Sequence, residues 1–394
     1  MNTLQLIRSK LTSDRLKKTL AYYVAFIGLG LANSSLGPTL PSLAANTHST
    51  LSQISILFIA RSAGYLIGAL SSGRLYDRLA GHKVMSLMVL GLAFALTLTP
   101  LVSQLTLLIL ILLVLGFTES LIDVGGNTLL IWVHRREVGP FMNGLHFFFG
   151  VGAFLGPIII AQLVLASGNI TWAYWTLALL IFPIALILLR LSSPASYDPN
   201  QAKANGPINY RLVSLMAAFF FLYVGAEVSF GGWIYTYATT LGIADKTSAA
   251  YLTSVFWGAL TLGRLLSIPL AVRFTPKTML WADLVGCILS VTLMLIWPAS
   301  LWVIGLGAVG LGLSMASMFP TMFSLAERNL TVTGAITGWF FVGASLGGMT
   351  LPWITGQYIE TIGAQVMLWM VMISSLLLMG VFAWIIRSTK EVVV

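Results

Sequence analysis

Residues 105–133 read LTLLILILLVLGFTESLIDVGGNTLLIWV, a stretch of 29 residues whose only charged side chains are Glu119 and Asp123. A helix rises about 1.5 Å per residue and the hydrocarbon core of a bilayer is about 30 Å thick, so about 20 mostly apolar residues cross it. The stretch is therefore long enough and apolar enough to be a transmembrane helix. Two acids near its middle need a reason to be there, because an ionised side chain at the bilayer centre costs about 2.5–3.5 kcal/mol or more.

The rest of the chain has the same character. Hydrophobic residues make up 58% and charged residues 8%, and the mean hydropathy is +0.92, whereas a soluble domain carries roughly 25% charged residues. The polar stretch Ser192 to Asn209 divides twelve apolar runs into two sets of six. The first set lies near residues 19–44, 52–76, 83–102, 105–133, 139–166 and 171–191, and the second near 210–241, 247–272, 276–298, 301–327, 332–358 and 364–387.

The two sets repeat each other. A shift of 195 residues places Gly30 and Gly37 on Gly225 and Gly232, and further glycine and arginine positions match at nearly the same offset. The sequence predicts an all-α membrane protein with twelve transmembrane helices in two pseudo-symmetric six-helix halves. We expect the halves to span residues 1–191 and 210–394, with residues 192–209 as a linker.

Basic residues decide the orientation. They concentrate in the N-terminal tail, in the connections after the even-numbered runs and in the tail after the last run, whereas the opposite connections carry only Lys246. This is the positive-inside bias, which predicts that the linker and both termini lie in the cytoplasm. The net charge of +9 does not indicate a nucleic-acid partner, because no soluble basic domain is present to bind one.

Polar side chains in the run 105–133 share one face of the helix. Glu119, Asp123 and Asn127 are spaced at i, i+4 and i+8, and successive members drift by only about 40° around the axis. Two carboxylates this close do not both stay charged without a cation. We predict a cation-coupling site that holds a proton or a sodium ion. A fixed ion pair with Arg61 in the second run is the alternative, and Arg61 is also a candidate for contacting the solute.

Other polar and aromatic side chains are candidates for binding a solute. Glu227 lies in the glycine-rich seventh run, where a carboxylate beside aromatic rings suits a hydroxylated ligand. A neighbouring helix that satisfies this lone acid is the alternative. For Arg264 in the eighth run and Asp283 in the ninth we expect an interhelical ion pair. The remaining solute-binding candidates are Asn33, His146, Trp233, Tyr237, Trp257 and Trp339.

A charged motif follows the second run. Residues 73–78 read GRLYDR and are followed by GHK at residues 81–83. The pattern resembles the cytoplasmic loop signature of the major facilitator superfamily, with one extra residue before Gly81. It predicts a gate motif of Gly73, Asp77 and Arg78, in which Asp77 pairs with basic residues when the cytoplasmic side is closed. Charge that only sets the membrane topology is the alternative.

Four sequence segments make the resemblance to this superfamily more specific. FLYVGAEV at 221–228 and MFPTMFSL at 318–325 resemble the bacterial fucose/galactose/glucose proton symporters, and RSAGY at 61–65 and LHFFFGVGAFLGP at 145–157 resemble the sodium-dependent glucose transporter-like proteins. The resemblance implies uptake of a monosaccharide across the bacterial inner membrane by a protein that we expect to be a monomer. Residues 25–43 contain no acid, unlike the first span of the fucose symporters, so we place sodium slightly ahead of the proton.

We therefore predict cation-coupled symport of a hexose-like sugar by alternating access, with no cofactor besides the coupling ion. Proton-coupled export of sugars or amphipathic drugs is an alternative, for which Met315, Met318 and Met322 are the evidence. A membrane sensor or scaffold without transport is a second alternative. Nothing in the sequence indicates an enzyme: no nucleophile elbow, phosphate loop or close histidine pair is present, and the single cysteine, Cys287, excludes an internal disulfide.

Overall fold

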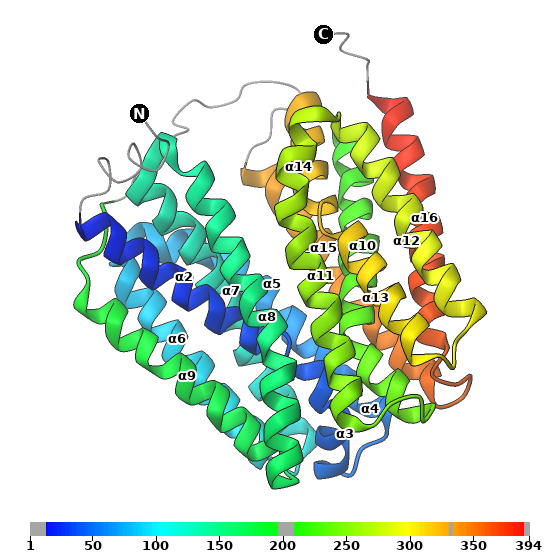
Figure 1. Ribbon diagram of the computed structural model, residues 1–394. Helices are drawn as coiled ribbons and strands as arrows, with labels where there is room; N and C mark the ends of the chain where they lie inside the picture. Colours follow the sequence, from blue (N-terminus) through cyan, green and yellow to red (C-terminus); the bar gives the residue numbers. More distant parts are fainter. Residues whose placement is uncertain (1–12, 196–208, 331–333, 390–394) are drawn as a thin grey trace.

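The long apolar runs form helices, some of them broken in two, in the structure, a computed structural model that describes residues 13–195, 209–330 and 334–389 (Figure 1). The first six runs give α2 (Ser13–Asn33), α3 (Leu36–Asn46), α4 (Leu51–Ile54), α5 (Ile56–Arg78), α6 (Gly81–Leu98), η1 (Thr99–Leu101), α7 (Leu105–His134), η2 (Arg135–Glu137), α8 (Gly139–Ser167) and α9 (Ile170–Arg190). The last six give α10 (Tyr210–Thr240), α11 (Lys246–Arg273), α12 (Pro276–Ile296), α13 (Leu301–Met315), α14 (Met318–Asn329), α15 (Gly334–Ile359) and α16 (Val366–Ser388).

These helices account for the predicted spans. Within the described residues, ten helices or nearly continuous helix pairs are long and apolar enough to cross a membrane, and the bent pair α2 and α3 makes eleven. The glycine-rich helix α15 has 26 residues and takes the remaining place between α14 and α16. The prediction of an all-α membrane fold is confirmed.

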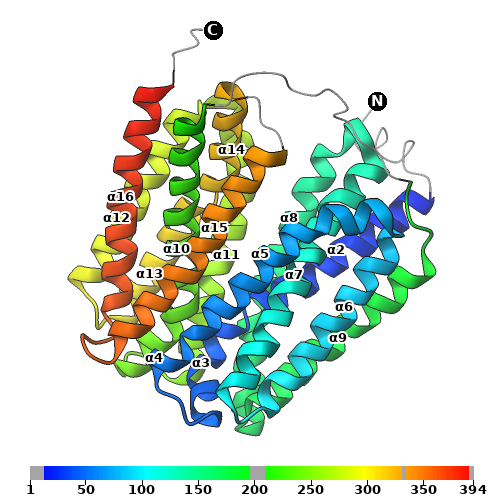
Figure 2. The same ribbon diagram turned by 180° about the vertical axis from the view of Figure 1, so that it is seen from behind.

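The helices form two bundles that lie side by side, α2 to α9 in one and α10 to α16 in the other (Figures 1 and 2). Both bundles use the same packing scheme. The helix α2 lies against α8 as α10 lies against α15, and α5 lies against α7 as α11 lies against α13. Glycines allow the closest of these approaches: Gly152 meets the backbone of Ile27, and Gly347 meets the backbone of Phe221, at nearly the predicted offset. We refer to the bundles as the N-terminal half and the C-terminal half.

Gly347→Val should test this packing. A Cβ at Gly347 would overlap the carbonyl oxygen of Phe221, and backbone cannot move aside as a flexible side chain can. We expect α15 to be pushed away from α10 and the protein to lose about 1–3 kcal/mol of stability. Thermal unfolding in detergent measures the loss. Gly380→Val is the control, because nothing lies within 4 Å of a Cβ at Gly380, and an equal loss in both variants would contradict the packing role.

Two spans are broken at matching places. The helices α2 and α3 meet at an angle of 47° across Ser34 and Ser35, and α13 and α14 are interrupted at Ala316 and Ser317. A proline lies at the third position of the helix after each break, Pro38 in one case and Pro320 in the other. Proline lacks an N–H group and its ring clashes with the carbonyl four residues earlier, which here belongs to Ser34 or Ala316. The breaks free carbonyl groups that need other partners.

In the part of the chain that the structure describes, the two halves lie in contact toward one end of the molecule and apart toward the other (Figures 1 and 2). We call the end with Ser13, Tyr210 and Ser388 the terminal face, and the end with α3 and α4 the distal face (Figures 1 and 2). Among the described residues, every hydrogen bond between the halves lies toward the distal face. These bonds join Leu51, Ser52 and Ser55 of the N-terminal half to Gln357 and Glu360, and Gln162 to Tyr251. Toward the terminal face the helices of the two halves diverge.

Candidate functional site

Glu119 is paired with Arg61. The Arg61 guanidinium donates from Nε to Oε2 at 2.8 Å and from Nη2 to Oε1 at 2.6 Å, a two-pronged ion pair between α5 and α7. Glu119 is only 3% exposed, and the Arg61 side chain is 13% exposed. The structure thus shows the fixed ion pair that the sequence left as an alternative. A carboxylate already neutralised by an arginine does not need a mobile cation.

The same arginine supports the break between α2 and α3. Its Nη1 donates to the carbonyl of Asn33 at 3.1 Å, and its Nη2 donates to the Asn33 side-chain oxygen at 3.2 Å. A carbonyl at a helix end in lipid has no water to bond, so a buried donor is needed. Asn33 was predicted to bind solute and instead joins the first span to the Arg61–Glu119 pair.

Asp123 lies one helical turn from Glu119 but has different partners. Its Oδ2 accepts from the Tyr65 hydroxyl at 2.5 Å and its Oδ1 accepts from the Asn127 amide at 3.0 Å, but no basic side chain of the described residues forms an ion pair with it. Asp123 and Asn127 are both half-buried. Of the two acids in the predicted stripe, Asp123 is therefore the one without an ion-pair partner among the described residues.

Asn127 presents its amide nitrogen, not its oxygen, to Asp123. The nitrogen also donates to the Asp123 backbone carbonyl at 2.9 Å. The three predicted ligands therefore do not form one set of oxygens in this conformation, since Glu119 faces Arg61 and Asn127 acts as a donor. No group of three acidic, histidine or cysteine side chains capable of holding a metal occurs within the described residues.

On the C-terminal half, Glu227 lies near Arg264. Both side chains are half-buried, on α10 and α11, and their charges interact, although no ion pair closer than 4.0 Å forms within the described chain. The expected ion pair between Arg264 and Asp283 is wrong. Asp283 instead accepts a hydrogen bond from Ser317, whose helix is interrupted there.

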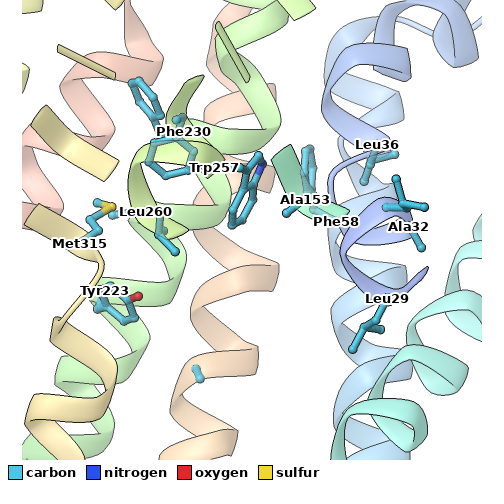
Figure 3. Close-up of a cluster of buried hydrophobic side chains, with 14 of the residues drawn as sticks. Leu29, Ala32, Leu36, Phe58, Ala153, Tyr223, Phe230, Trp257, Leu260 and Met315 are labelled. Atoms are coloured by element: carbon cyan, nitrogen blue, oxygen red, sulfur yellow. The ribbon is translucent and has the colours of Figure 1, made fainter. Parts of the chain in front are cut away.

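Several buried polar atoms on α10 and α11 have no hydrogen-bond partner at normal distance among the described residues. They include the hydroxyl of Tyr223, the indole nitrogen of Trp257 and the hydroxyls of Ser229 and Ser254. Figure 3 shows the Tyr223 hydroxyl on the side facing the N-terminal half, and Trp257 directed toward Phe58 and Ala153. Buried donors without partners cost about 1–3 kcal/mol each, so a ligand or water that bonds to them is favoured. Tyr223 was not among the predicted candidates.

His146 lies on α8 of the N-terminal half. Its ring meets the edge of Phe26 at 6.0 Å between centroids, and the Arg264 charge acts on it from the other half. Solute binding by Trp257 and His146 stays a prediction.

Three aromatic candidates lie elsewhere. Trp233 is fully buried, and its indole donates to the Pro352 carbonyl at 2.9 Å. Tyr237 is also buried and donates to the Pro298 carbonyl at 2.8 Å, which ties α10 to the loop before α13. Both were predicted to contact solute and are instead packing residues near the distal face, because a buried donor takes the nearest free carbonyl.

Trp339 is 57% exposed and lines a groove of about 360 Å³ between α10 and α15, beside Tyr210 and Leu346. The opposite side of α15 meets the N-terminal half, where Gly348 lies near Ser62. The solute-binding prediction for Trp339 is therefore wrong, and an outward-facing tryptophan is a common membrane-facing feature.

The gate motif ends α5 at the terminal face. Gly73, Asp77 and Arg78 are exposed, and Asp77 forms no ion pair among the described residues. Within the described part of the chain, Asp77 makes none of the predicted pairs with basic residues in this conformation, in which the halves diverge at the terminal face.

Comparisons with known proteins agree with this architecture. A sequence model of the Major Facilitator Superfamily matches residues 22–352. The sodium-dependent glucose transporter 1 of Danio rerio is 32% identical over 86% of this chain and 64% of its own length, so the chain spans less than two thirds of that protein. The protein of the same name from Homo sapiens is 30% identical over 84% of this chain and 71% of its own length.

A crystal structure of the nucleoside transporter NupG is similar in fold, with a TM-score of 0.74 over 94% of this chain and 99% of that chain at 17% identity. The match of the family model to most of the sequence confirms the resemblance seen in the motifs. The chain belongs to the major facilitator superfamily, and it is a membrane transporter and not an enzyme.

Proposed function

We propose that this protein is a secondary active transporter that couples the movement of one monovalent cation to uptake of a hexose-like sugar. The observation that carries the proposal is Asp123, a half-buried carboxylate in the middle of a transmembrane helix that has hydrogen-bond donors but no ion-pair partner among the described residues. Such an acid is stable in the membrane when a cation or proton visits it. The neighbouring Glu119 is excluded from this role by its pairing with Arg61.

The solute site lies between the halves. Glu227 supplies an acceptor, the Trp257 indole supplies a donor with no partner among the described residues, and the Tyr223 hydroxyl lies beside Glu227, close to aromatic faces. This combination suits a sugar ring, which has hydroxyls at its edge and apolar faces above and below. The relatives named sodium-dependent glucose transporter 1 favour a monosaccharide as solute and make sodium the first cation to test.

We place the terminal face in the cytoplasm, because exposed basic residues gather there. Arg74, Arg78, Arg190, Arg273 and Arg328 all lie exposed at the terminal ends of their helices. With that orientation, the conformation is closed to the outside and open to the cytoplasm. A monomer in the bacterial inner membrane remains our prediction for assembly and location.

Asp123→Asn tests the coupling role. Purified protein in proteoliposomes is given an inward sodium or proton gradient, and accumulation of labelled hexose is measured. We expect the variant to lose gradient-driven accumulation at least about tenfold, because the neutral amide no longer attracts the cation, while hexose exchange without a gradient persists. Glu327→Gln, at an exposed acid on α14, is the matched control and should accumulate normally. Full accumulation by Asp123→Asn would exclude this site.

Drug export remains the alternative prediction. Met315, Met318 and Met322, on which it rests, are buried inside the C-terminal half. No observation in the structure favours this alternative over sugar uptake.

A further inference from the structure

Three helices of the C-terminal half come together at the outer side of the terminal face. The first turn of α10 packs between α15 and the last turn of α16, and Figure 2 shows the three helices side by side. The groove of about 360 Å³ beside Trp339 follows α10 on its α15 side, and a pocket of about the same volume lies on its α16 side. Tyr210 lines the groove and the next residue, Arg211, lines the pocket, so the two openings adjoin.

The groove is mostly apolar and extends about halfway through the membrane. It is lined by residues that include Tyr210, Ala217, Phe221, Trp339 and Leu346. From Tyr210 to Phe221 the helix rises about 16 Å, roughly half of the 30 Å hydrocarbon core. Gly343 forms part of the floor, because a Cβ there would meet the Ala217 carbonyl. The length and lining suit one acyl chain of the leaflet next to the terminal face.

The pocket is basic. Arg211 and Arg387 both line it, and the Arg211 guanidinium lies over the Trp384 ring, 5.5 Å from its centroid, which holds this arginine at the pocket. Neither arginine forms a hydrogen bond or an ion pair with another described residue. The matching end of the N-terminal half differs, since Lys18 on α2 pairs with Asp14 at 2.6 Å. The pocket therefore carries two positive charges that no described acid balances.

The two openings together match one kind of ligand. A guanidinium binds a phosphate group through two parallel hydrogen bonds, and each arginine has five N–H donors. Exposed tyrosine and tryptophan side chains, here Tyr210, Trp339 and Trp384, are typical of the level of the lipid headgroups. A soluble phosphate has no chain to fill the groove, and a lipid with a choline group brings a positive charge that the arginines repel. An anionic phospholipid has both the charge and the chain.

We propose that the terminal ends of α10, α15 and α16 bind one anionic phospholipid, with its phosphate between Arg211 and Arg387 and one acyl chain in the groove beside Trp339. The proposed function is not needed for this inference, because no residue of the gap between the halves takes part. With the terminal face in the cytoplasm, the lipid comes from the leaflet whose anionic lipids give it a negative surface potential.

Native mass spectrometry of the purified protein in detergent tests the charge requirement. Phosphatidylglycerol or phosphatidylcholine with the same acyl chains is added, and the bound lipid is counted. We expect one phosphatidylglycerol to bind at least about tenfold more tightly than phosphatidylcholine. Arg211→Gln/Arg387→Gln should weaken phosphatidylglycerol binding about 25-fold, about fivefold for each arginine. Arg190→Gln/Arg273→Gln, which removes two exposed arginines from the ends of α9 and α11, is the matched control and should bind normally.

A second variant tests the groove and leaves both arginines in place, so it also serves if the double variant does not fold. Ser214 is exposed and lines the groove, and Ser214→Phe should block the path of the acyl chain. We expect phosphatidylglycerol to bind about tenfold more weakly, the cost of about two displaced methylene groups. Soluble glycerol 3-phosphate at the same concentration should not displace the lipid.

Three results would overturn the proposal. Equal binding of the two lipids, or equal losses in the two double variants, would mean that the basic face attracts lipid without a specific site. Displacement by glycerol 3-phosphate would mean a phosphate site that does not need the chain. Phosphatidylglycerol binding that appears only after Glu391→Gln would assign the two arginines to the acid in the C-terminal tail.

Discussion

Glu119→Gln should destabilise the folded protein by about 3–5 kcal/mol, more than any other substitution considered for this chain. Glutamine has nearly the same shape but no charge and only one acceptor oxygen, so the buried Arg61 guanidinium would lose its counter-charge and keep at most one of its two hydrogen bonds. Arg61 also holds the Asn33 carbonyl at the break of the first span, and a shift of its side chain would release that carbonyl too. Thermal or denaturant unfolding of purified protein in detergent measures the effect.

A double variant separates charge from packing. Arg61→Met/Glu119→Leu removes both charges and keeps side chains of similar volume, so most of the electrostatic cost should disappear. The break at Asn33 would still lack its donor, and a residual loss of about 1–2 kcal/mol should remain. If Glu119→Gln unfolds at the same temperature as the unmodified protein, the Arg61–Glu119 ion pair does not stabilise the fold. Glu119 is then again a candidate for binding the coupling cation.

The architecture could be predicted from the sequence because it depends on local and repeated signals. Apolar length sets each span, and the glycine offset between the halves reports contacts that recur in both, such as Gly152 on Ile27 and Gly347 on Phe221. The break in the first span was not predicted, although Pro38 was a signal for it. Most of the predicted linker, and the basic residues of the N-terminal tail before residue 13, lie outside the described residues.

The site was predicted less well because helical spacing shows which side chains share a face and not which partner each one meets. Glu119 and Asp123 lie one turn apart, yet one faces Arg61 and the other faces Tyr65. Arg61 was recognisable as a partner because an arginine within an apolar run needs an acid nearby. The same reasoning paired Arg264 with Asp283, which is wrong. Two side chains at equal depth in the membrane need not lie on neighbouring helices.

Gly37→Ala should open the distal face. Gly37 on α3 belongs to the N-terminal half and meets the backbone of α10 in the other half, so that a Cβ would lie 2.7 Å from the carbonyl oxygen of Gly231. Only separation of the two halves relieves this overlap, because backbone on both sides cannot rotate away. At about 1–3 kcal/mol, the strain should shift the equilibrium about 5- to 150-fold toward the conformation that is open at the distal face.

Labelling of an introduced cysteine measures this shift. Ser55 is fully buried at the distal contact, and the single native cysteine, Cys287, is buried as well, so Ser55→Cys reports opening against little background. A membrane-impermeant maleimide should label Ser55→Cys faster when Gly37→Ala is present. Gly28→Ala is the control, since its Cβ would meet only the flexible Ile181 and Ile184 side chains of the same half. Faster labelling in both variants would mean that each substitution loosens the fold in general and not the contact between the halves.

Because the strain at Gly37 acts between the halves, it should also slow net uptake while leaving the unfolding temperature nearly unchanged. A packing defect inside one half does not produce this combination.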